Sequence, residues 1–139
     1  MELGFETGGW CPPGKVSENG KIPPQYKLIE TTKDRSIHAH AIPRSQRTEN
    51  NVRFSDATLV LIPESIKTDI GTEWTLECAR HYKKPFLAIS PYQPEANKRI
   101  IEWIRKSRPE IINIAGPSEK ISPGIYNQSY KLLTEILNR

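Results

Sequence analysis

Short, uninterrupted apolar segments that alternate with helical segments constrain the fold of this chain most strongly. Residues 57–62 read Ala-Thr-Leu-Val-Leu-Ile, and similar segments occupy residues 85–90 and 111–115. Strands that are apolar at nearly every position are typical of a parallel sheet covered on both faces. Helical patterns follow over about residues 71–82 and again after Pro94. Strands alternating with helices predict an α/β fold with a doubly wound parallel sheet.

The two ends of the chain differ in character. Residues 1–44 are rich in glycine and proline, and we expect loops there, with a short strand over residues 26–30 and room for another over residues 4–7. A helix capped by Ser45 is expected to run to about Phe54, and a last helix to begin at Ser122-Pro123. With 139 residues, the chain fits a single domain over residues 1–139.

Charge and hydropathy exclude several classes of protein. Twenty basic and 16 acidic residues give a net charge of +4, which suits an anionic ligand but is too weak for a nucleic-acid-binding surface. No segment approaches the roughly 20 apolar residues of a membrane span, and residues 1–5 lack the basic and apolar regions of a signal peptide. We therefore expect a cytoplasmic protein with no membrane contact. Cys11 and Cys78 are expected to be reduced.

The segment after the first apolar strand has the form of an anion-binding site. The loop over residues 63–70 leads from the carboxyl end of that strand into Gly71, Thr72 and Thr75. Ligands of open α/β sheets bind at the carboxyl ends of strands, and the unpaired N–H groups of a helix start favour an oxyanion. The alternative is an ordinary connection in which a threonine caps the helix.

Two further segments are candidates for ligand contact. Gly8 and Gly9 permit close backbone approach, and Trp10 could stack on a flat ring. Arg47 and Asn51 are one helical turn apart and share a helix face. The alternatives are a rigid turn with a buried tryptophan in the first segment and a solvated face in the second.

The remaining chemically active residues are expected to be structural. No second cysteine or histidine lies at ligand spacing from Cys11, so an inert thiol is expected, and Cys78 is expected in the core. His38 and His40 lack a third ligand, so no metal site is predicted. A set of cations on the helix after Pro94 is expected to be a solvated face; it comprises Lys98, Arg99, Arg105, Lys106 and Arg108.

Taken together, these segments resemble the putative molybdenum cofactor carrier family. That family is Rossmann-like and related to the lysine-decarboxylase-like nucleotide-binding proteins. The most specific matches are Gly8-Gly9-Trp10-Cys11-Pro12, Arg47-Thr48 with Asn51-Val52-Arg53, Gly71-Thr72, and Ala115-Gly116-Pro117 with Pro123-Gly124-Ile125-Tyr126. The resemblance implies a Rossmann-like three-layer parallel sheet with helices on both faces.

The sequence departs from the family pattern at its start. Family members usually begin with a strand and a glycine-rich loop, whereas this sequence begins where the following helix should end. We expect that missing strand to be central, between residues 26–30 and 57–62, so that the family sheet cannot form in a single chain. The true start could lie upstream, the segment could be lost, or a partner chain could fill the gap, and a homo-oligomer is therefore predicted.

The resemblance implies a non-catalytic binding protein. Its ligand would be the molybdenum cofactor (molybdopterin) or a nucleotide, and molybdoenzymes would be its partners. The residues expected to bind it are Gly8, Gly9, Trp10, Arg47, Asn51, Gly71, Thr72, Thr75, Gly116 and Pro117.

Two alternatives remain at this stage. One is a nucleotide-processing enzyme similar to phosphoribohydrolases. Its Gly-Thr-x-x-Glu motif would place the catalytic glutamate where Thr75 stands here, which leaves Glu73 and Asp56 as the nearby carboxylates. The other is a truncated family member that keeps only an oligomerisation surface and binds no ligand.

Overall fold

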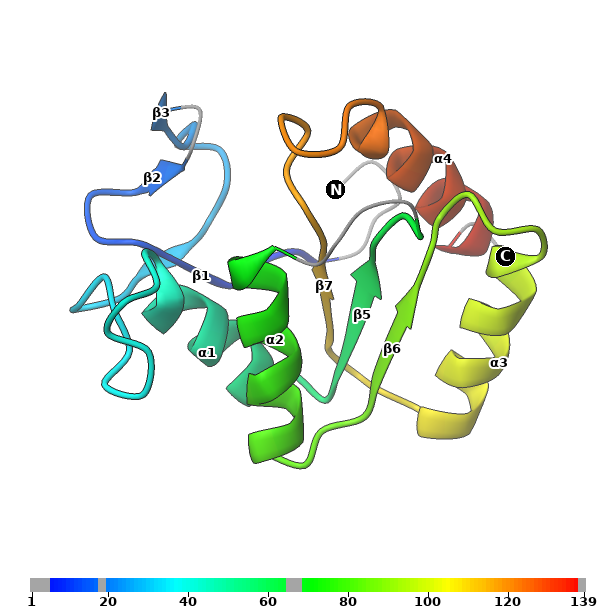
Figure 1. The fold of residues 1–139 in the computed structure, drawn as a ribbon, viewed down its shortest axis with the longest axis horizontal. Helices are drawn as coiled ribbons and strands as arrows, with labels where there is room; N and C mark the ends of the chain where they lie inside the picture. Colours follow the sequence, from blue (N-terminus) through cyan, green and yellow to red (C-terminus); the bar gives the residue numbers. More distant parts are fainter. Residues whose placement is uncertain (1–5, 18–19, 65–68, 138–139) are drawn as a thin grey trace.

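The computed structural model describes residues 6–17, 20–64 and 69–137. Its centre is a parallel three-stranded sheet in the order β6-β5-β7 (Figure 1). β5 (Ala57–Leu61) lies between β6 (Phe86–Ile89) and β7 (Ile112–Ala115). In register, Leu59 stands opposite Leu87 on one side and opposite Ile114 on the other. All five residues of β5 are buried, as the uninterrupted apolar run predicted.

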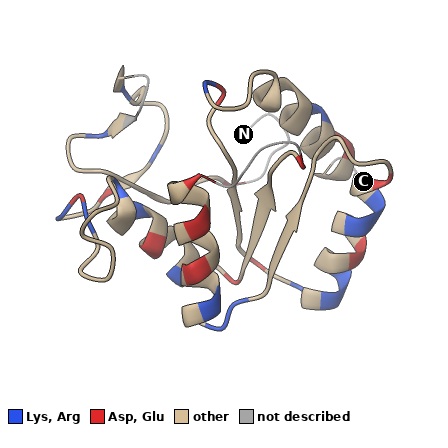
Figure 2. Cartoon of the chain, viewed as in Figure 1, with Lys and Arg blue, Asp and Glu red and all other residues tan. Residues whose placement is uncertain are grey.

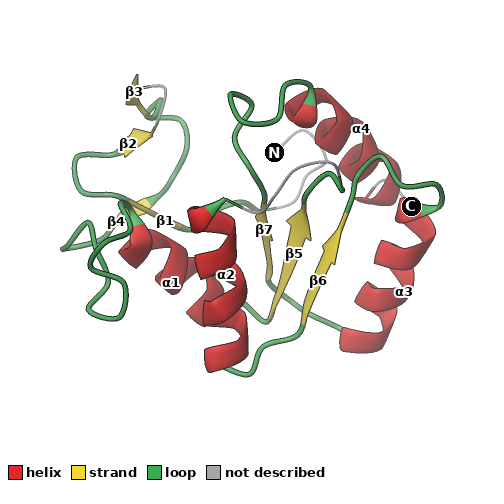
Figure 3. Ribbon diagram, in the orientation of Figure 1, coloured by secondary structure: helices red, strands yellow, loops and turns green. Residues whose placement is uncertain are grey.

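Helices cover both faces of this sheet, which confirms the three-layer α/β fold (Figure 3). One layer contains α3 (Ala96–Ser107) and α4 (Ile125–Leu137). Side chains of β5, β6, α3 and α4 form the larger core cluster, in which Leu59, Leu61, Ile89, Ala96, Ile100, Leu132 and Ile136 are buried.

The second layer contains α1 (Ser45–Arg53) and α2 (Ile70–His81), which pack against each other. Their cluster consists of Val52, Trp74, Cys78 and Ala79, all buried, and it confirms the prediction that Cys78 belongs to the core. α1 does not use Ser45 as its cap, which corrects the prediction. Arg44 is the N-cap in the left-handed region, and the Ser45 hydroxyl instead accepts a hydrogen bond from the Ser36 N–H at 2.8 Å.

β6 differs from the prediction of a strand buried on both faces. Leu87 and Ile89 face the α3–α4 layer, whereas Phe86 and Ala88 are exposed. β6 lies at the end of the three-stranded sheet, and the guanidinium of Arg80 lies 5.5 Å from the Phe86 ring centroid. An apolar run alone does not distinguish a strand with two covered faces from one with a single covered face.

Among the described residues, no strand joins residues 26–30 to residues 57–62 in one sheet, because β4 (Ile29–Glu30) pairs only with β1 (Trp10–Cys11) in a separate small sheet. β7 occupies the position beside β5 and pairs with it in parallel, from Ala57 opposite Ile112 to Val60 opposite Ala115. β7 is the last strand in the described sequence and forms an edge of this sheet, because its other side pairs with no described strand. The predicted missing strand and the homo-oligomer inferred from it therefore both stay predictions.

The first 44 residues are mostly loop, as predicted, with two small sheets. β1 (Trp10–Cys11) pairs in parallel with β4 (Ile29–Glu30), and β2 (Val16–Ser17) forms an antiparallel pair with β3 (Gly20–Lys21). The strand predicted over residues 26–30 is shortened to β4. Of the strand considered over residues 4–7, positions 6 and 7 are irregular, and the first two positions lie outside the described residues.

Charge is spread over the surface, and the basic face predicted on α3 is exposed to solvent, with acidic residues beside it (Figure 2). None of the described helices is long and apolar enough to cross a membrane.

Candidate ligand-binding cleft

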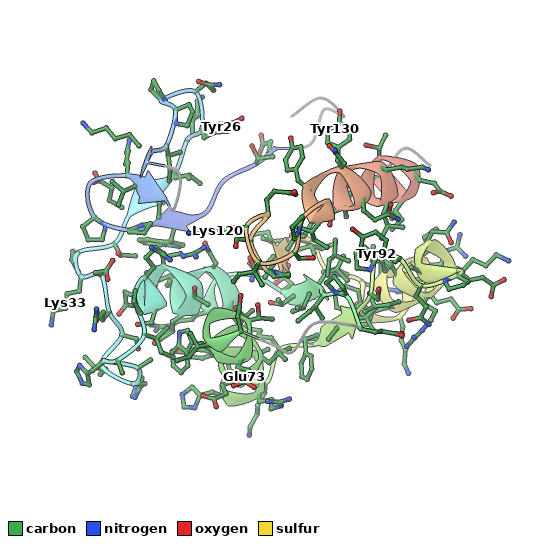
Figure 4. The ribbon with its side chains drawn as sticks, turned by 45° about the horizontal axis from the view of Figure 1, so that its top comes forward. Tyr26, Lys33, Glu73, Tyr92, Lys120 and Tyr130 are labelled. Carbon is green, nitrogen blue, oxygen red and sulfur yellow. The ribbon has the colours of Figure 1, made fainter. Side chains whose placement is uncertain are left out.

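A cleft of about 820 Å³ opens at the carboxyl ends of β5 and β7. Its walls are β1, the start of α1, the start of α2, and the loop and first turn that follow β7 (Figure 4). The position agrees with the rule that open α/β sheets bind ligands beyond the carboxyl ends of their strands. Eight of the ten predicted site residues line this cleft: Trp10, Arg47, Asn51, Gly71, Thr72, Thr75, Gly116 and Pro117.

The other two predicted site residues, Gly8 and Gly9, directly precede Trp10 in the sequence and do not line the cleft in the described structure. Gly9 has φ +133°, and a Cβ on it would lie 3.0 Å from Oδ1 of Asn51. Glycine therefore leaves room for the Asn51 side chain to reach the backbone of β1.

Asn51 uses both ends of its amide on that backbone. The Trp10 N–H donates to Oδ1 at 2.7 Å, and Nδ2 donates to the Trp10 carbonyl at 3.3 Å. The Trp10 ring stacks on Phe54 with centroids 5.7 Å apart. Asn51 and Trp10 thus form part of the cleft wall while their main contacts are made within the protein.

The start of α2 differs from the open anion site that its sequence suggested. Asp69 is the N-cap, and its carboxylate accepts a hydrogen bond from the Thr72 N–H at 2.6 Å. The Thr75 hydroxyl donates to the Gly71 carbonyl at 3.1 Å. Asp69 therefore occupies part of the helix terminus with a negative charge. An aspartate just before a helical segment is a capping signal that sequence reasoning missed here.

The loop after β7 brings a second carboxylate to the cleft. Glu119 accepts hydrogen bonds from the Gly124 N–H at 2.6 Å and the Tyr126 N–H at 3.0 Å. These two backbone donors hold the pKa of the Glu119 carboxyl below its ordinary value. Gly116, at the start of this loop, passes so close to β5 that a Cβ on it would lie 2.5 Å from the Leu61 carbonyl oxygen. Because Glu119 is exposed and joins residues several positions away, no local sequence signal predicted its role.

Cationic and apolar side chains share the cleft. Arg44, the N-cap of α1, and Arg47 in its first turn line the cleft. Lys120 lines it from the loop after β7 (Figure 4). Its apolar lining includes large side chains that are exposed to solvent, namely Val16, Ile70, Ile114, Ile121 and Tyr126. Cations attract an anion, and exposed apolar surface gains from being covered.

Cys11 lies in the wall of the cleft but is buried and a free thiol. Burial, and secondarily the carboxylate of Glu30, raises the pKa of the Cys11 thiol. Among the described residues, no group of three His, Cys, Asp or Glu side chains is placed to hold a metal ion. His38 lies in a loop with its ring centroid 6.0 Å from that of His81.

The carboxylates considered for hydrolysis lie away from the cleft. Asp56 directly precedes β5, at the end opposite the cleft, and accepts hydrogen bonds from the N–H groups of Glu110 and Ile111. Glu73 is an exposed residue of α2. Of the described residues, the carboxylates that line the cleft are Asp69 and Glu119, and both are helix caps.

Comparisons with known proteins agree with this architecture. A family model described as the circularly permutated YpsA SLOG family matches residues 1–137. The crystal structure of a putative molybdenum carrier protein from Syntrophus aciditrophicus SB is similar, with a TM-score of 0.80 and 33% sequence identity over 95% of this chain and 78% of that chain. A comparison with curated proteins gave no match.

Two of these comparisons show the family of the chain, because the family model matches nearly all of it and the similar protein is 33% identical. The chain therefore belongs to the circularly permutated YpsA SLOG family, together with proteins described as putative molybdenum carriers.

Proposed function

We propose that this protein is a non-catalytic carrier that binds an anionic, pterin-like or nucleotide-like ligand in the cleft, with the molybdenum cofactor as the first candidate. The observation that carries the proposal is the cleft itself. It has about 820 Å³, lies at the carboxyl ends of two parallel strands, and combines cations with exposed apolar surface. The cleft volume is within the range of small-molecule sites, because pockets of roughly 300–1,000 Å³ bury most of the surface of a small-molecule ligand.

The distribution of charge supports an anionic ligand. Three cationic side chains, Arg44, Arg47 and Lys120, line the cleft. The description of the similar Syntrophus protein as a putative molybdenum carrier supports the choice of first candidate.

The carboxylates support a carrier over a hydrolase. A general acid or base must reach the reacting group of the substrate. Asp69 and Glu119 hold backbone N–H groups of α2 and α4, and Asp56 stands at the other end of β5. A protein that only binds its ligand, through hydrogen-bond donors and apolar contacts, needs no carboxylate as an acid or base. Molybdoenzymes as recipients, and a homo-oligomeric state, remain predictions that follow from the carrier hypothesis and from the family resemblance.

Purification from a host that makes the molybdenum cofactor tests the proposal. The protein is denatured, the released pterin is oxidised, and its fluorescence is measured together with the molybdenum content. We expect pterin fluorescence and molybdenum in the wild-type protein. Both should fall several-fold in Lys120→Glu, because the charge reversal makes the cleft as a whole less favourable for an anion. The matched control is Lys106→Glu, the same change on the exposed face of α3.

Two results would contradict the proposal. One is wild-type protein without pterin or molybdenum. The other is release of free base when the purified protein is incubated with nucleoside monophosphates, which would favour the hydrolase.

A further inference from the structure

We infer that the ligand lies across the cleft in one orientation, with its anionic group beside Arg44 and Arg47 of α1 and its flat ring on Tyr126 of α4. This inference rests on the proposed function and assigns the two ends of the ligand to opposite walls.

The anionic end is assigned by the charges on each wall. Arg44 and Arg47 line the cleft at the start of α1, and Thr48 beside them adds a hydroxyl. The starts of the two other helices at the cleft carry the carboxylates of Asp69 and Glu119. A second anion placed beside either carboxylate would be repelled, whereas the guanidinium groups on α1 attract it.

The ring end is assigned by the aromatic side chains. Trp10 was the sequence-based candidate, but it is only partly exposed and its ring stacks on Phe54. Tyr126 lines the cleft and is 67% exposed, and its ring stacks on that of Tyr130 with centroids 6.3 Å apart. Figure 4 shows Tyr130 on α4 and Lys120 on the preceding loop.

Apolar neighbours extend the Tyr126 surface. Ile114 of β7 and Ile121 of the following loop also line the cleft and are 44% and 45% exposed. A flat heteroaromatic ring placed on Tyr126 would cover these side chains, and aromatic stacking adds to the gain from burial. The cleft thus has two cations at the start of α1. At α4 it has an aromatic, apolar surface, beside which the carboxylate of Glu119 offsets the cation of Lys120.

Three probes separate the two ends of the ligand. Guanosine monophosphate carries a ring and a phosphate, guanosine the ring alone, and ribose 5-phosphate the phosphate alone. Guanine contains the same 2-amino-4-oxopyrimidine unit as a pterin, so it is a suitable probe for either ligand class. Affinities are measured by calorimetry for the wild-type protein and for single variants.

Tyr126→Ala is expected to weaken binding of guanosine monophosphate and guanosine by about tenfold and to leave ribose 5-phosphate unchanged. Tyr126→Phe should bind like the wild type, because the ring face and not the hydroxyl makes the contact. The control is Tyr26→Ala, the same change at an exposed tyrosine that does not line the cleft in the described structure.

Arg44→Asn is expected to weaken the two phosphate-bearing probes by about tenfold and to leave guanosine unchanged. Asparagine suits this position because Arg44 has φ 59°, and asparagine tolerates the left-handed region. Arg53→Gln, on α1 but outside the described cleft lining, is the control.

The outcomes distinguish the inference from the function on which it rests. If the wild type binds guanosine monophosphate and Tyr126→Ala binds it equally well, the orientation is wrong and the carrier function stands. The orientation is also wrong, and the carrier function stands, if Arg44→Asn weakens the binding of guanosine as much as that of guanosine monophosphate. If the wild type binds none of the probes and retains no pterin, the proposed function fails and the orientation fails with it.

Discussion

Individual residues of the cleft wall differ in whether their polar groups face the ligand space or the protein. The amide of Asn51 is held by the backbone of Trp10, and the hydroxyl of Thr75 by its own helix. Arg44 and Lys120, which no motif singled out, reach the cleft from elements far apart in the sequence. Recognition of a ligand would therefore depend on side chains that lie between the family motifs as well as on the motifs.

Both cysteines are expected to be unreactive in the native protein. Cys11 and Cys78 are 2% and 1% exposed. Burial raises the pKa of both thiols, that of Cys78 to about 12, with Glu49 adding to the shift. At pH 8, a disulfide reagent such as Ellman's should release little colour from the folded protein and the full amount after denaturation. Rapid labelling of Cys11 in the folded protein would contradict this prediction.

Gly116→Ala is expected to destabilise the protein. A Cβ on Gly116 would lie 2.5 Å from the Leu61 carbonyl oxygen, which belongs to the central strand and cannot move freely. The overlap should lower the free energy of unfolding by about 1–3 kcal/mol in urea denaturation. Gly71→Ala is the matched control, because its Cβ would meet only Oδ1 of Asp69 at 3.7 Å. Equal stability of the two variants would show that β5 and the loop separate more easily than the structure indicates.

At the scale of the elements, two of the three described helices that begin at the cleft are capped by a carboxylate. α2 and α4 begin at the cleft with a carboxylate of the chain itself, and the caps satisfy N–H groups that would otherwise lack partners. α1 instead begins with Arg44 in the left-handed region and without a side-chain cap bond. The three helix starts therefore present different charges to the same cleft.

The cap of α4 should make its first turn sensitive to acid. The pKa of Glu119 is lowered by the N–H groups of Gly124 and Tyr126, so the folded value lies below the ordinary value of 4.5. The stabilisation by Glu119 is then fully present above pH 4.5 and is lost as the pH falls through the folded pKa. In amide exchange, Gly124 and Tyr126 should lose protection over this range.

Glu119→Ala separates this effect from general acid unfolding. The variant should melt below the wild type at pH 7, and the difference should shrink below pH 4.5. Glu102→Ala, at an exposed residue of α3, is the control. A melting-temperature difference that stays constant with pH would show that the carboxylate charge does not stabilise the turn.

At the scale of the whole molecule, one buried carboxylate joins the loop-rich first part to the α/β part. Glu49 of α1 is 7% exposed and accepts hydrogen bonds from the hydroxyls of Ser36 and, at 2.7 Å, Tyr82. Trp74 of α2 also donates from its indole nitrogen to the Ser45 carbonyl at 3.0 Å. These bonds fix the loop before α1, which contributes Arg44 to the cleft.

Glu49→Ala is expected to lower the free energy of unfolding by about 2–3 kcal/mol, because it leaves two hydroxyl groups without their acceptor. Glu49→Gln should lose less, since the amide oxygen can still accept. Urea denaturation measures both, with Glu77→Ala, an exposed residue of α2, as the control. A loss below 0.5 kcal/mol for Glu49→Ala would indicate that surrounding water replaces the carboxylate.

The sequence by itself determined the local elements of the fold. The apolar run of β5 and the helical spacing of α2, α3 and α4 predicted these elements within a few residues. They could be predicted because hydrophobic periodicity is a property of neighbouring positions. The motif residues also identified the region of the cleft, since glycines and capping residues follow directly after strands.

Only the tertiary structure decided the order of the strands and the chemistry of the cleft. The placement of β7 beside β5 joins residues more than 50 positions apart, and the Asn51–Trp10 bonds span 41 positions. A local pattern cannot specify such contacts, because they depend on how the chain returns through space. The anion site suggested by Gly71, Thr72 and Thr75 changed for the same reason: folding placed Asp69 at that helix start and set Arg44, Arg47 and Lys120 around the cleft.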